Sequence, residues 1–67
     1  MGQNDKKISA LIKATDVASV LNLSKTHVYF LVRRGDLPAV FLSEKAVRFD
    51  PNDVQEFIDS RRTRGEE

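Results

Sequence analysis

The segment from Val17 to Pro38 constrains the fold more than any other, because it contains two helical patterns joined by only three residues. The second pattern is the clearer one. Ser24 is a good N-cap, and no Gly or Pro interrupts residues 25–34 before Gly35, a common C-terminal signal. The following Asp36-Leu37-Pro38 prevents continuation of the helix. The sequence therefore predicts a helix over residues 25–34.

This helix has one apolar face and one polar face when its residues are placed at about 100° intervals. The aliphatic residues that share the first face, and that we expect to pack, are Val28, Leu31 and Val32. The residues on the opposite face are Thr26, Phe30 and Arg33, flanked by His27, Tyr29 and Arg34. We expect this outer face to be exposed to a partner.

The segment before the turn predicts a shorter helix that packs against the helix over residues 25–34. Its apolar stripe consists of Ala14, Val17, Ala18, Val20 and Leu21. Thr15 is the natural N-cap by residue type, although the pattern also allows a start near Lys13. Asp16 falls in the first turn, where a negative charge suits the helix dipole. In the turn itself, Asn22 tolerates a left-handed backbone and Leu23 fills the gap between the helices, which cross closely at the small Ala18.

After Pro38 the pattern changes from helical to extended. Residues 39–42 and 46–49 predict two strands of a small β-hairpin, or wing, around a polar turn at Ser43-Glu44-Lys45. Because this turn has no Gly or Asn-Gly, we predict a loose or bulged loop with Lys45 near its tip. Arg48 then alternates outward between two apolar neighbours.

A third helix is predicted after the wing. Asp50 is its N-cap, Pro51 occupies the first position and Asp53 lies in the first turn. The residues expected to close the core together are Val54, Phe57 and Ile58 with Phe41 and Phe49.

The chain is interpreted as one mainly α domain with a small β-hairpin, a winged helix-turn-helix, over residues 8–60. Residues 8–12 are an extended lead-in, residues 1–7 a disordered segment and residues 61–67 a flexible tail, in which Arg61, Arg62 and Arg64 are solvated or reach a partner. A domain of 67 residues without Cys has a thin core, which supplies only about 3–5 kcal/mol of stability.

Charge is segregated along the chain, although the net charge is only +1. Residues 24–48 carry five basic and two acidic side chains, whereas residues 49–60 carry four acidic and no basic ones. This distribution favours one face for phosphates and another turned away from them. His27 is the only His and has no second ligand or nucleophile at a recognisable spacing, so we expect no metal, no cofactor and no enzymatic activity.

No apolar run approaches the ~18 residues of a membrane span, and no signal-peptide pattern precedes the domain. We therefore expect a soluble cytoplasmic protein, associated with the nucleoid when it is bound to DNA.

The motifs resemble the small winged helix-turn-helix domains of the excisionase and AlpA type, which are distant relatives of the MerR DNA-binding domain. The matching positions, over about residues 11–60, are Leu11-Ile12, Asp16-Val17-Ala18, Leu21, Leu23-Ser24, Val28-Tyr29, residues 31–35, Leu37-Pro38, Arg48-Phe49, Asp53-Val54 and Phe57. The departures are Asn22 in place of the turn Gly, a wing tip without Gly, and Phe30 where a polar or basic residue is common.

This resemblance implies binding of double-stranded DNA, with the second helix in the major groove and the wing beside it. Carried over, the DNA-binding positions are Ser24, Lys25, Thr26, His27, Tyr29, Arg33 and Arg34 on the helix and Lys45 and Arg48 on the wing. Phe30 departs from the family pattern and is a further candidate contact, because it lies on the same outer face. It also implies a recombination directionality factor that assists an integrase or recombinase, or a small transcriptional regulator of a mobile element. A monomer of this size has a modest footprint, so neighbouring copies on DNA are expected as partners.

Several roles stay open at this point. Phe30 contacts a thymine methyl, anchors a protein partner, or packs against the wing or the N-terminal segment. Tyr29 hydrogen-bonds a phosphate or covers the core edge, and Arg34 contacts phosphate or complements the helix C-terminus. The alternative function is a protein–protein adaptor that uses the same outer face, with weak or no DNA binding.

Overall fold

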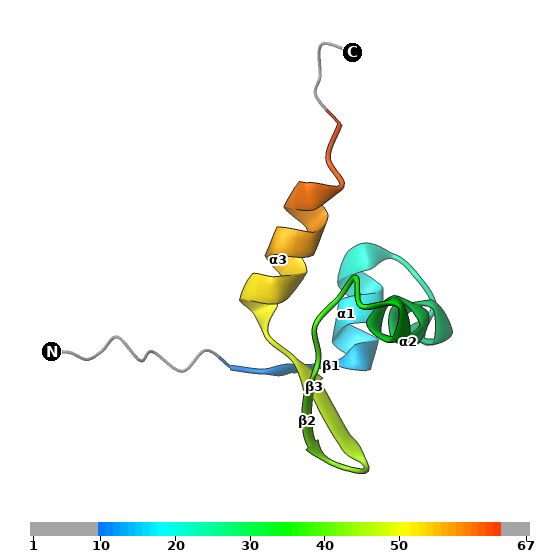
Figure 1. Ribbon diagram of the computed structural model, residues 1–67, viewed down its shortest axis with the longest axis vertical. Helices are drawn as coiled ribbons and strands as arrows, with labels where there is room; N and C mark the ends of the chain where they lie inside the picture. Colours follow the sequence, from blue (N-terminus) through cyan, green and yellow to red (C-terminus); the bar gives the residue numbers. More distant parts are fainter. Residues whose placement is uncertain (1–9, 64–67) are drawn as a thin grey trace, which may run out of the picture.

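A computed structural model describes residues 10–63 of the chain. Its elements are β1 (Ile12–Lys13), α1 (Ala14–Leu21), α2 (Lys25–Arg34), β2 (Val40–Ser43), β3 (Ala46–Phe49) and α3 (Pro51–Ser60). Helices α1 and α2 pack together on one side, α3 lies on the other, and the β2–β3 hairpin projects away from all three (Figure 1). Three helices with a small antiparallel hairpin form the expected winged helix-turn-helix.

The turn between α1 and α2 has the predicted chemistry. Asn22 is left-handed, with φ of 59°, and the Leu23 amide donates to the Ala18 carbonyl at 2.9 Å. Ser24 caps α2, because its hydroxyl accepts a hydrogen bond from the His27 amide at 3.1 Å. At the other end Gly35 adopts φ of 84°, a conformation that costs a glycine little. The limits of α2 are those predicted.

The start of α1 settles the two alternatives left by its sequence. Lys13, not Thr15, occupies the N-cap position, so Thr15 as the N-cap was wrong. Asp16 lies in the first turn as expected, and its carboxylate accepts a hydrogen bond from the Lys13 amide at 3.2 Å. Val20 was also wrongly assigned to the packed stripe, since it is 60% exposed.

The sheet has three strands, in the order β1-β3-β2, where two were predicted. The short β1 pairs with β3 in the register Ile12↔Phe49 and Lys13↔Arg48. The strand β1 therefore begins at Ile12, the last residue of the expected lead-in. In the hairpin the pairing shifts between Phe41 and Ser43, which is the predicted irregularity, and Glu44-Lys45 form the turn.

The core lies where α1, α2, β3 and the start of α3 meet. Its buried side chains are Ala14, Val17, Ala18, Val28, Leu31, Leu37, Phe49 and Val54. Val32, Phe57 and Ile58 pack partly buried against them, as predicted. Leu37 is only 1% exposed, a core position that the sequence interpretation did not assign.

Phe41 was wrongly placed in the core, because it is 67% exposed. Phe41 belongs to β2 of the hairpin, which projects beyond the helices (Figure 1), whereas Phe49 at the end of β3 is fully buried. The helix after the wing begins as predicted, with the Asp50 carboxylate accepting from the Asn52 amide at 2.8 Å and Pro51 in the first turn. The segments 1–7 and 64–67, expected to be disordered or flexible, lie outside the described residues.

Substitution by aspartate at the buried Val28 and at the exposed Val20 tests the packing of α1 and α2. Val28→Asp places a charge at a site with 0% exposure, and an unpaired buried charge costs more than the ~3–5 kcal/mol that a core of this size supplies. We expect this variant to be unfolded at 25 °C by circular dichroism. Leu31→Asp is expected to do the same.

The matched control is Val20→Asp, the same substitution at an exposed position of α1. We expect it to retain the wild-type spectrum, and Thr26→Ala to leave the melting temperature nearly unchanged. Equal destabilisation by Val20→Asp and Val28→Asp would contradict the assignment of the faces.

Candidate nucleic-acid interface

The outer face of α2 is exposed along its whole length. The residues predicted as DNA contacts on α2 and at its N-cap, all exposed, are Ser24, Lys25, Thr26, His27, Tyr29, Phe30, Arg33 and Arg34. Burial of Val28 and Leu31 on the opposite side fixes the rotation of the helix about its axis. The structure thus brings these eight side chains to one accessible surface.

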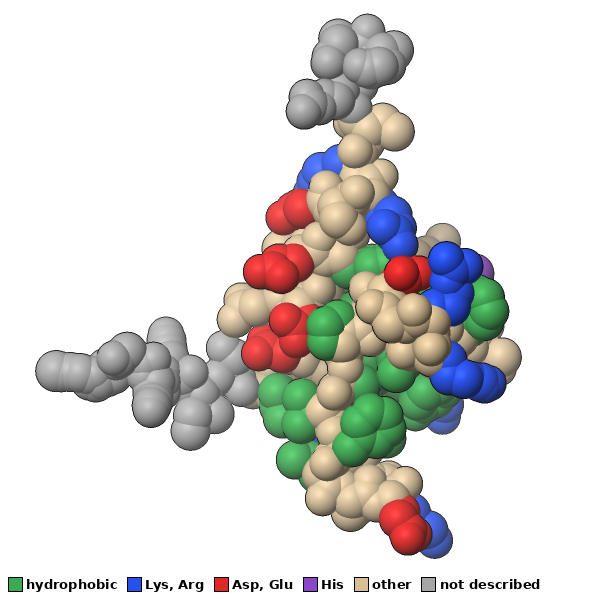
Figure 2. Space-filling view, in the orientation of Figure 1, with side chains coloured by type: hydrophobic (Ala, Val, Ile, Leu, Met, Phe, Trp, Pro, Cys, Tyr) green, Lys and Arg blue, Asp and Glu red, His purple; other side chains and the backbone are tan. Residues whose placement is uncertain are grey.

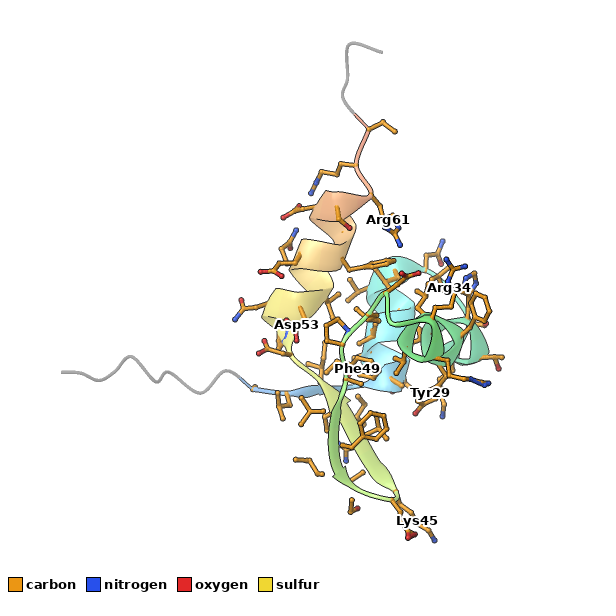
Figure 3. The ribbon with its side chains drawn as sticks, in the orientation of Figure 1. Tyr29, Arg34, Lys45, Phe49, Asp53 and Arg61 are labelled. Atoms are coloured by element: carbon orange, nitrogen blue, oxygen red, sulfur yellow. The ribbon has the colours of Figure 1, made fainter. Side chains whose placement is uncertain are left out.

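The two arginines at the end of α2 differ in their surroundings. Arg34 Nε lies 3.2 Å from Asp36 Oδ2, and Arg61 Nη2 lies 3.5 Å from the same oxygen. Arg34 and Arg61 accordingly lie on facing sides of the gap between α2 and the end of α3 (Figure 3). Arg33 makes no ion pair within residues 10–63, so its guanidinium remains available.

Phe30 sits in a small stack on the outer face. Its ring lies 5.8 Å from that of His27 in an edge-to-face arrangement, and the Arg34 guanidinium lies 5.6 Å from its centroid. All three residues belong to α2. The ring is 49% exposed, so about half of its surface is accessible to a partner.

A cavity of about 190 Å³ opens between the start of α1, the outer side of α2 and the hairpin. Tyr29 and four cationic side chains contribute to its wall: Lys13, Lys25, Lys45 and Arg48. Tyr29 lies on the side of α2 nearer the hairpin, and Lys45 lies at the hairpin tip (Figure 3). The two wing residues predicted from the sequence are therefore on the same side of the molecule as α2.

Arg48 is half-buried and points away from the core, as the alternation of β3 predicted. Its Nη1 donates to the Val47 carbonyl at 2.9 Å. Since a guanidinium has five N–H donors, this bond orients the group and leaves most of its donors available.

The opposite side of the molecule is acidic. Acidic side chains gather over α3, whereas Lys and Arg gather over α2 (Figure 2). The pKa of Asp59 is lowered, mainly because Arg62 donates a hydrogen bond at 3.0 Å and further because Gln55 donates one at 3.1 Å. The charge segregation read from the sequence is therefore present in three dimensions.

Lys13 and Arg61 have roles that the sequence interpretation missed. Lys13 lines the cavity only because β1 pairs with β3. A strand of two residues is too short to show the alternating pattern by which strands are recognised in a sequence. Arg61, expected in a solvated or partner-reaching tail, instead lies 4.7 Å from the Phe57 ring centroid and reaches Asp36. The first described residue of the tail is thus anchored to α3.

The comparison with protein families agrees with this geometry. The model of a helix-turn-helix domain family matches residues 11–62, which is most of the chain. The chain belongs to this helix-turn-helix domain family. Neither curated proteins nor solved structures gave a match. Helix-turn-helix domains read DNA with the second helix of the motif, and in this domain that helix is α2.

Within residues 10–63, no helix is long and apolar enough to cross a membrane. The same described part of the helix-turn-helix domain contains no group of three His, Cys, Asp or Glu side chains placed to hold a metal ion.

The charge segregation predicts effects of different size on DNA affinity for two acidic residues. Asp36→Asn removes the carboxylate that engages Arg34 and Arg61. We expect it to tighten binding to random duplex at low salt by up to about fivefold, equivalent to ~1 kcal/mol, with a similarly small loss of stability.

Asp59→Asn is the matched control, because it removes the same charge from the acidic side. Its effect on DNA affinity is expected to be much smaller, since screening acts over about 10 Å at 0.1 M salt. Fluorescence anisotropy at 50 mM salt measures both. If the two variants tighten binding equally, only net charge matters and the interface is misplaced.

Proposed function

We propose that this protein binds double-stranded DNA sequence-specifically, with α2 in the major groove and the wing against the adjacent backbone or minor groove. Base contacts come from the first turns of α2, chiefly Lys25 and Thr26, with Phe30 against a thymine methyl. The sugar-phosphate backbone is held by Tyr29, Arg33, Lys45 and Arg48. These contacts position the helix, together with Ser24, His27 and Arg34.

The observation that carries the proposal is the placement of these cations. Helix α2 and the wing present Lys25, Arg33, Lys45 and Arg48 on one side, while the acidic residues gather over α3. A duplex attracts the first surface and repels the second. The net charge of +1 thus understates the field at the interface.

In the cell, we propose that the protein is an excisionase-like recombination directionality factor or a small transcriptional regulator of a mobile element, acting in the cytoplasm at the nucleoid. The resemblance of the motifs to the excisionase and AlpA type supports this role. An integrase or recombinase, or neighbouring copies of the chain, would complete the complex, and the chain itself would carry out no chemistry. Site selection from random DNA, followed by an excision assay with an integrase encoded nearby, separates the two roles.

Salt titration tests the DNA contacts directly. The slope of log K against log salt is about −0.9 per phosphate contacted. We expect Arg33→Gln and Arg48→Gln each to make the slope shallower by about one phosphate, and Thr26→Ala to alter site preference with little change in slope. Affinities in the millimolar range for every duplex at low salt would exclude the proposal.

A second candidate function is a protein–protein adaptor, and the exposed stack of His27, Phe30 and Arg34 favours it. An aromatic ring flanked by an arginine resembles the anchors that dominate protein interfaces. In this case DNA binding would be weak or absent.

Phe30→Ala discriminates between the two functions. Under the DNA proposal it weakens binding to the selected site by about 1 kcal/mol, the order of one buried methyl group, only if a thymine occupies the contacted position. Replacing that thymine by uracil, which lacks the methyl, should therefore weaken wild-type binding and leave the variant unchanged. Its melting temperature is expected to stay close to wild type, because the ring is half exposed. Uracil replacement without effect at every thymine of the site would remove Phe30 from the base contacts.

A further inference from the structure

The cavity between α1, α2 and the hairpin gathers positive charge from three separate elements. Lys13 comes from β1, Lys25 from the start of α2, and Lys45 and Arg48 from the wing. No acidic residue is among the described residues that line it. Its volume of about 190 Å³ equals roughly six water molecules at ~30 Å³ each, enough for a tetrahedral oxyanion with some of its hydration.

Lys13 is a poor choice for the position it occupies. It stands at the N-cap of α1, where a side-chain acceptor is preferred and no side-chain cap bond is formed. An ammonium group can only donate hydrogen bonds, and its charge opposes the positive end of the helix dipole. Local helix stability therefore does not explain this lysine.

Lys25 repeats the same conflict on α2. It is the first residue of that helix, and the first turn contains no acidic residue. Two helices thus direct their positive ends and a lysine each toward one cavity. An anion in the cavity would turn both conflicts into attractions.

The sheet adds a third conflict at the same place. Lys13 and Arg48 are register partners in the β1–β3 ladder, and both line the cavity. Like charges directly opposite each other in antiparallel strands are destabilising. The conflict disappears when an anion lies between the two side chains.

We infer that this cavity is a binding site for one phosphodiester group of the DNA backbone, with Lys13 as a phosphate ligand that the sequence pattern did not indicate. Lys13 and Arg48 hold the group from the sheet, and the Tyr29 hydroxyl donates to one of its oxygens. Lys25 holds the group from α2 in place of the base contact proposed above. The inference deepens the proposed function and rests on it.

The location of the cavity supports a backbone phosphate over a base. A sugar-phosphate strand separates the major groove from the minor groove. When α2 occupies one groove and the wing reaches the other, that strand must pass between them, where the cavity opens.

The test compares Lys13→Gln with Arg62→Gln, a control that removes one charge from an exposed residue paired with Asp59, outside the cavity. We expect Lys13→Gln to bind every duplex roughly fivefold to tenfold more weakly at 0.1 M salt, with a slope shallower by about 0.9 and an unchanged site preference. Because it also removes the conflicts described above, its melting temperature without DNA should equal or exceed that of wild type.

A double-mutant cycle pairs each protein with duplexes in which one phosphate at a time is replaced by a neutral methylphosphonate. At one position this replacement should weaken wild-type binding strongly and leave binding by Lys13→Gln unaffected, since the charge pair is then already absent. If wild type binds its site and Lys13→Gln behaves like Arg62→Gln, the phosphate site is wrong and the proposed function stands. A lower melting temperature for Lys13→Gln would make Lys13 a structural residue.

A titration with inorganic phosphate tests whether the cavity binds a free anion and not a phosphate of the DNA backbone. If wild type binds no duplex, but phosphate raises its melting temperature more than that of Lys13→Gln at equal ionic strength, the cavity holds a free anion and the DNA assignment fails. No effect of phosphate and no duplex binding would overturn both proposals.

Discussion

Burial of one stripe of α2 against α1 is the constraint on which the rest of the structure depends. Val28 has no exposed surface and Leu31 very little, so the helix cannot rotate without exposing them. The left-handed Asn22 and the bond from Leu23 to Ala18 set the path of the turn and hence the crossing of the two helices. Every side chain on the opposite face of α2 is thereby held outward. The small core thus determines which residues meet a partner, although only Ala14 among its members also lines the cavity of the interface.

A second layer of organisation is electrostatic, and it works against local stability. Lys13 and Lys25 stand at the positive ends of two helices, and Lys13 faces Arg48 across a ladder. Each conflict costs a few tenths of a kcal/mol to about 1 kcal/mol, a noticeable share of the small stability of such a domain. Favourable local pairings act elsewhere, as where Asp36 joins the end of α2 to Arg61. The conflicts converge on one cavity, and the ion pairs within residues 10–63 lie outside it, a pattern expected of a site built for a negatively charged ligand.

The sequence predicted those parts of the fold that depend on near neighbours. Ser24, Gly35 and Asp50 act within a few residues of themselves, so residue type alone indicated the limits of α2 and the start of α3. Prediction from the sequence was wrong or incomplete where a residue's neighbours in the structure are far from it in the sequence. The exposure of Val20 and Phe41, the burial of Leu37 and the third strand all depend on how the helices and hairpin are placed around the core. Lys13 belongs to the same class, because its neighbour Arg48 is brought to it only by strand pairing.

The separation of charge gives this domain a direction of approach. With acidic residues over α3 and cations over α2 and the wing, the molecule is an electric dipole despite its net charge of +1. Near a duplex, the field turns the cationic side inward before any contact forms, and the acidic side resists the reverse orientation. A weakly charged protein also gains less from nonspecific phosphate contacts, which scale with the number of cations engaged. The low net charge therefore favours discrimination between DNA sites, because a smaller share of the total affinity comes from contacts that are independent of sequence.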